Sequence, residues 1–180
     1  MKRYSDLADS ILGDHYLLQK LRPTEVSDTA KLLRVRAAND AEISDARPVA
    51  SPPMFSLVRA GLLYALDAID ESHRIIQAVD GDESAYCHGM VHRREGDFYN
   101  ARYWFSRAGT LSSFGSIHRA ASAVSSVVAA QANWDPYLFT GLCEQERFGD
   151  TEIRGELVKL QRIEFEVLFD YLWRRSFNLK

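Results

Sequence analysis

The fold is decided by residues 84–109, which read SAYCHGMVHRREGDFYNARYWFSRAG. Gly96 can end a helix in the left-handed conformation, and the Asp97 side chain can cap the helix that follows. The stretch therefore predicts a helical hairpin that turns at Gly96-Asp97. Because helical spacing dominates the rest of the chain and strand-like alternation is scarce, we predict an all-α fold, a single domain of stacked antiparallel helical hairpins.

The hairpin resembles a tetratricopeptide repeat, whose signature runs W-x2-L-G-x2-Y, then A-x3-F, then P. The residues that fit are Gly89, Gly96, Phe98, Ala101, Phe105 and Ala108. The early Trp, the Leu and the final Pro are replaced by Ala85, His88 and Ser113. A weaker copy starts about 29 residues upstream, short of the usual period of about 34. We therefore expect paired hairpins rather than a repeat array.

Proline residues separate an N-terminal arm from the rest. Residues 1–53 form this arm, with helical patterns over 4–21 and from Thr24 to about Ala38. Residues 39–53 are expected to be a loop that contains ARPVASPP, since each Pro removes a backbone donor and disfavours helix in the residue before it. Residues 54–180 form the helical-hairpin core, and both parts are expected to make one domain overall.

Further helices are expected in this core. They span Met54–Ala68, Glu71–Val79 with Asp70 as its cap and a stop at Asp80-Gly81, residues 115–131, a helix begun by Asp135 and Pro136 and ended near Gly149, and a long one from Asp150 to about Arg175. The last helix carries apolar residues on two faces. Two explanations are open for it: burial within the chain, or a homodimer interface.

The composition narrows the function. A net charge of −3 lacks the basic footprint of nucleic-acid-binding proteins. Cys87 and Cys143 have no C-x-x-C partner and are too few to staple a secreted domain, so we expect reduced thiols in a cytoplasmic protein. The N-terminus has no apolar signal region, and no run reaches the roughly 18 uncharged apolar residues of a membrane span. Neither nucleic acid nor a membrane is an expected partner.

A second resemblance is closer. The run from His88 to Gly109, His-Gly-x-x-His-Arg-Arg-Glu-Gly-Asp-x-x-Asn-Ala-x-Tyr-Trp-Phe-x-Arg-x-Gly, looks like the signature of a family of uncharacterised bacterial and fungal proteins. The later Trp134-Asp135-Pro136 resembles that family's downstream motif. The chain departs from the pattern at Cys87, where Trp is expected, and after Gly109, where His-Pro is expected. The resemblance implies an all-helical fold and no established activity.

One constellation in the hairpin has chemical potential. His88, His92 and Glu95 stand at i, i+4 and i+7 and so share one helix face. The repeat pattern turns both histidines inward, where an unpaired imidazole costs roughly 1–3 kcal/mol. In a first reading each is structural and bonds a backbone carbonyl or an aspartate of a neighbouring helix. In a second they bind zinc, because H-x3-H suits two ligands on one helix. The third ligand is then open among Cys87, His118 and Glu144.

In a third reading these side chains line a pocket for a small anionic ligand. Arg93, Arg94 and Arg107 would stand near its mouth, because guanidinium matches carboxylate and phosphate. A histidine there can act as a general acid or base. Asn100 and Trp104 are further ligand-binding candidates, although local capping and core packing also explain them.

Some of these residues have plainer explanations. Arg93 and Arg94 can pair with Glu95 or Asp97 on a solvated face, and His73 reads as an isolated histidine. No motif names a reaction. The sequence thus favours a cytosolic binding or interaction module, with a protein or a small anion as partner and no cofactor predicted. The alternative is an enzyme or a metal-binding protein that uses the histidine site.

Overall fold

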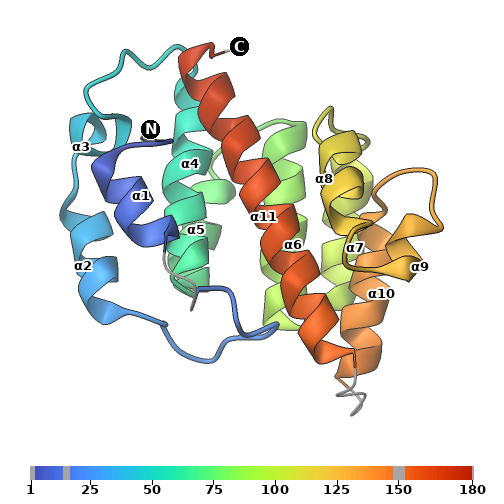
Figure 1. The fold of residues 1–180 in the computed structure, drawn as a ribbon. Coiled ribbons are helices and arrows are strands. Elements are labelled where there is room, and N and C mark those ends of the chain that lie inside the picture. Colours follow the sequence, from blue (N-terminus) through green and yellow to red (C-terminus); the bar gives the residue numbers. More distant parts are fainter. Residues whose placement is uncertain (1–2, 14–16, 148–152, 180) are drawn as a thin grey trace.

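The computed structural model describes residues 3–13, 17–147 and 153–179, and the regular structure in these ranges is entirely α-helical. The all-α prediction is therefore confirmed. Figure 1 shows the helices, which are α1 (Asp6–Leu12), α2 (Thr29–Ala37), α3 (Asp40–Ser44), α4 (Pro52–Ala65), α5 (Ile69–Ile76), α6 (Asp82–Glu95), α7 (Phe98–Ala108), α8 (Phe114–Ala121), α9 (Ser126–Ala129), α10 (Pro136–Glu146) and α11 (Arg154–Phe177).

The predicted hairpin is α6–α7. Gly96 ends α6 with a φ of 82°, a left-handed conformation that glycine adopts without the cost of a Cβ. The Asp97 side chain then accepts a hydrogen bond from the backbone N–H of Asn100 at 3.1 Å, which caps α7. Gly89 on α6 lets the helices approach closely, because Phe105 of α7 lies against it. The turn at Gly96-Asp97 is confirmed.

The hairpin packs on a second one, α4–α5, through contacts between α5 and α6. Helix α11 crosses the front of the molecule in Figure 1 and contacts α4, α8 and α10. Its second apolar face, at Phe165, Leu168 and Leu172, is 5%, 2% and 2% exposed. Helices of the same chain therefore cover this face. Of the two explanations for the apolar faces of the last helix, this favours burial within the chain.

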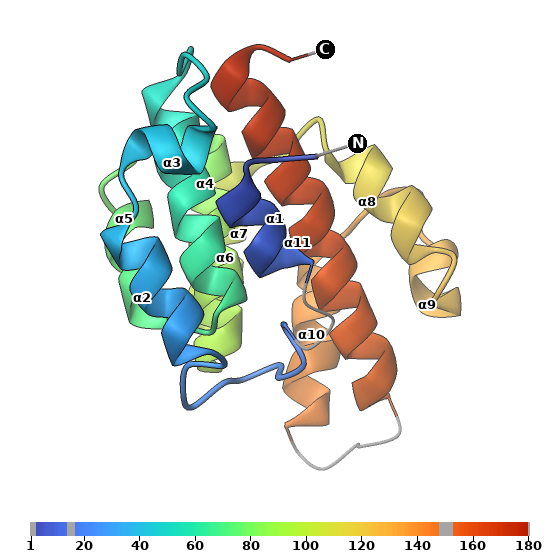
Figure 2. The ribbon, with the colours of Figure 1, turned by 60° about the vertical axis from the view of Figure 1, so that its left-hand side comes forward.

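The N-terminal helices belong to the same core. Figure 2 shows α1, α2 and α3 beside α4, and Ile11, Val35 and Ile43 are almost completely buried. The prediction that residues 39–53 are a loop is wrong for the first part of this segment. Asn39 and Glu42 form a reciprocal capping box that starts α3.

The predicted helix over 115–131 is interrupted. It ends at Ala121 and resumes as α9, because the Ser125 side chain accepts a hydrogen bond from the N–H of Val128 and starts a new helix. Helix α2 begins at Thr29, with Asp28 as its cap, rather than at Thr24. The predicted cap at Asp135 is confirmed, whereas Gly149 and Asp150 lie outside the described residues. No helix among the described residues has both the length and the apolar character needed to cross a bilayer.

Candidate metal centre

Both histidines of α6 face the protein interior. His88 is 6% exposed and His92 7% exposed, as the hairpin pattern predicts. Their burial follows from the position of α6, which packs against α5 on one side and α7 on the other. A buried imidazole needs partners for its ring nitrogens, so the neighbouring helices determine what these side chains can do.

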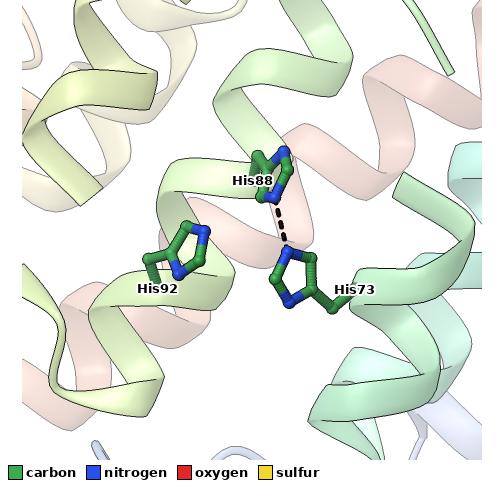
Figure 3. Close-up of side chains that lie close together, drawn as sticks. All are labelled: His73, His88 and His92. Atoms are coloured by element: carbon green, nitrogen blue, oxygen red, sulfur yellow. Dashed lines mark hydrogen bonds between the residues drawn. The ribbon is translucent and has the colours of Figure 1, made fainter. Parts of the chain in front are cut away.

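The first partner is a third histidine. The Nε2 atoms of His73, on α5, and His88 lie 2.5 Å apart, and Figure 3 shows the ring of His92 beside this pair. One ring nitrogen from each of the three lies within 4.8 Å of the others. An N–H···N bond needs a lone pair on one nitrogen. One of the two Nε2 atoms of His73 and His88 therefore carries the proton, and the other accepts it with its lone pair.

Glu95 fixes the orientation of two of these rings. Its carboxylate oxygens lie 2.7 Å from Nδ1 of His92 and 3.5 Å from Nδ1 of His73. The hydrogen bond from His92 holds the pKa of Glu95 below its usual value, so the carboxylate is ionised and accepts. A carboxylate on Nδ1–H leaves the lone pair on Nε2, which is how outer carboxylates orient histidine ligands of metals. In His73 this Nε2 faces Nε2 of His88, and in His92 it faces the side-chain nitrogen of Asn100.

His88 is uncharged at neutral pH. Burial disfavours its imidazolium, and the nearby His73 and His92 add to the effect, so that its pKa falls to about 4. Its ring also stacks on Trp104 of α7, with the ring centroids 3.9 Å apart and the planes 18° from parallel. A metal ligand must be a neutral imidazole, and His88 meets this requirement at pH 7.

Asn100 of α7 completes the surroundings. Its side-chain nitrogen lies 3.1 Å from Nε2 of His92. The structural reading is corrected in its details, because the recorded partners of the two α6 histidines are His73, Glu95 and Asn100 rather than a backbone carbonyl or an aspartate.

Arg93 and Arg94 do not stand at the mouth of this site. Arg93 is 2% exposed and forms an ion pair with Glu164 of α11, while Arg94 is 1% exposed and pairs with Asp67. The sequence also allowed both arginines to pair with Glu95 or Asp97 on a solvated face. That alternative is wrong, because both are buried and have other partners. The two guanidinium groups hold α6 to the core, because a buried charge persists only when it is paired.

Arg107 is placed differently. It is exposed and lines a groove beside His88 and Trp104. Of the three arginines that were expected near the mouth of an anion pocket, Arg107 is the one that lies beside such an opening.

The three suggested third ligands are elsewhere. Cys87 is a buried free thiol, and burial raises its pKa to about 12, so it carries no thiolate at neutral pH. His118 bonds the carbonyl of Val128 at 3.2 Å, and Glu144 pairs with Arg102 at 2.5 Å. His73 takes the place that was left open. In the sequence alone, His73 reads as an isolated histidine. The predicted helix end at Asp80-Gly81 could have revealed its place in the cluster, because His73 and His88 are equally far from that point in the sequence.

Comparison with models of known protein families, with curated proteins and with solved structures finds no match to this chain.

Proposed function

We propose that this protein binds one divalent transition-metal ion, which the imidazole ligands suggest is zinc, through one ring nitrogen each of His73, His88 and His92. Imidazole nitrogen is a preferred ligand of zinc. The observation that carries the proposal is the grouping of three imidazoles, two of which contact the Glu95 carboxylate through Nδ1.

The spacing of the cluster supports this ligand set. Zinc–nitrogen bonds of about 2.0–2.1 Å in a tetrahedron place the nitrogens roughly 3.3 Å apart. The observed separations, from 2.5 Å to at most 4.8 Å, lie on either side of that value. For zinc to bind both Nε2 atoms, the proton that lies between His73 and His88 would move to Nδ1 of His88, because each ligand nitrogen needs its lone pair.

Three protein ligands leave a fourth position open. Sites with three ligands and one exchangeable position are typical of catalytic zinc, whereas structural zinc has four protein ligands. The proposal therefore includes a metal that can take water or a substrate as its fourth ligand. We also propose a cytoplasmic location, supported by the unpaired thiols of Cys87 and Cys143.

The test is a zinc titration of chelator-treated protein by calorimetry. We expect one zinc ion per chain. Changing Glu95→Gln should weaken binding about 10–100-fold, as is typical for an outer-shell partner, and changing His73→Ala should weaken it further. The control is His118→Gln, which lies outside the cluster and should bind as the parent does. Absence of binding, or equal affinity in His73→Ala, would refute the proposal.

A further inference from the structure

A groove lies next to the histidine cluster but extends away from it. It has a volume of about 460 Å³ and runs between the turn that joins α5 to α6 and the outer side of α7. His88 and Trp104 lie at its inner side, and Asp80, Asp82 and Arg107 contribute its charges. This volume is in the range of small-molecule sites. The groove shares only His88 with the cluster, and its other lining residues contribute nothing to the proposed metal site.

Its positive charge comes from an arginine without a partner. Within the described ranges Arg107 forms no ion pair or side-chain hydrogen bond, whereas Arg93, Arg94 and Arg102 each pair with a carboxylate. A guanidinium group offers a planar fork of donors that matches a carboxylate. Arg107 therefore presents an unused carboxylate-binding group to the groove.

The negative charges of the groove come from the segment that joins α5 to α6. Asp80 lies in the α5–α6 turn and Asp82 is the first residue of α6, and both are exposed. Neither forms an ion pair with Arg107 or with any other cation of the described chain, so these carboxylates too are unused. A ligand that carried only negative charge would be repelled by both.

Aromatic rings also line the groove. Trp104 is half-buried, and Tyr103 is 51% exposed and meets it edge-on at 5.5 Å. Aromatic faces attract ammonium groups as well as apolar groups. The groove thus combines a free guanidinium group, two free carboxylates and an accessible aromatic surface.

We propose that this groove binds a small zwitterion of the amino-acid or short-peptide class. The carboxylate of the ligand binds Arg107, its ammonium group binds at Asp80 and Asp82, and its carbon skeleton lies on Trp104. This assignment refines the small anion that the sequence suggests, because the carboxylates in the groove require a positive group on the ligand.

The experiment compares three related probes: alanylalanine, its N-acetyl derivative, which lacks the ammonium group, and its C-terminal amide, which lacks the carboxylate. Binding is followed in metal-free protein by the NMR signal of the Trp104 indole N–H, assigned with Trp104→Phe. We expect alanylalanine to bind at least about tenfold more tightly than either derivative, since a charge-assisted hydrogen bond is worth about a factor of ten or more.

Variants assign each charge. Arg107→Gln should weaken alanylalanine about tenfold and leave the amide unchanged, while the double variant Asp80→Asn, Asp82→Asn should weaken alanylalanine and leave the N-acetyl derivative unchanged. Arg119→Gln, an exposed arginine on α8, is the matched control and should change nothing. Equal binding of the three probes, or no shift of the indole signal at millimolar concentration, would overturn the proposal. Because the protein is free of metal, this result would leave the zinc proposal standing, and a failure of zinc binding would leave the groove standing.

Discussion

The ring of Phe105 lies so close to Gly89 that a Cβ on the glycine would come within 2.6 Å of two ring carbons. This contact sets the separation of α6 and α7, and so it also sets the distance from His88 to Trp104 and from His92 to Asn100.

Gly89→Ala should destabilise the protein by about 1–3 kcal/mol, because overpacking forces side chains or backbone to move. Gly141→Ala is the matched control. Gly141 also lies within a helix, but nothing stands within 4 Å of its added Cβ, so alanine should be neutral or stabilise by up to about 1 kcal/mol. Urea denaturation at constant m-value measures both. Equal midpoints for the two variants would show that the helices have room to separate.

Glu164→Gln should destabilise the protein by about 3–5 kcal/mol, since it leaves a buried guanidinium group without its counter-charge. Glu164 pairs with Arg93 and accepts a hydrogen bond from Tyr86 at 2.7 Å, and Tyr86 accepts one from the Trp134 indole at 2.7 Å. The loss should appear as a lower urea midpoint.

The control for this change is Glu71→Gln, which breaks an ion pair with Arg36, a side chain that is 51% exposed. That loss should be at most about 1 kcal/mol. Similar losses for Glu71→Gln and Glu164→Gln would mean that the buried pair is solvated in solution.

Both thiols should be unreactive in the native protein. Burial raises the pKa of Cys87 to about 12 and that of Cys143 to about 12, so at pH 8 the thiolate fraction is about one in ten thousand. Iodoacetamide labelling followed by mass spectrometry should modify neither residue until urea unfolds the chain. Labelling of native protein at the rate of a free thiol would contradict the buried position of both.

The sequence was sufficient for the hairpin but not for its surroundings. Gly96-Asp97 specifies the α6–α7 turn locally, through a left-handed residue and a cap, and the inward direction of His88 and His92 follows from it. The ion pairs of Arg93 and Arg94 were not predictable in the same way. Their partners lie 71 and 27 residues away in sequence, on α11 and in the segment after α4, and only the tertiary fold brings them close.

His73 is an intermediate case. An antiparallel hairpin that turns at Asp80-Gly81 places residues at equal distances from the turn opposite each other, and His73 and His88 are equally far from its centre. The same rule about Gly96-Asp97 sets Phe105 level with His88 and so brings Trp104, the residue before it, close to His88. The signal was therefore present in the sequence, and it needed the two turns to be combined into one register.

The central claim is that three imidazoles hold one metal ion, and X-ray absorption at the zinc edge tests it most directly. In protein loaded with one equivalent of zinc, we expect three imidazole nitrogens and one light fourth ligand at about 2.0–2.1 Å, with one imidazole lost in His73→Ala. A sulfur scatterer at about 2.3 Å, or a spectrum that His73→Ala leaves unchanged, would contradict the claim.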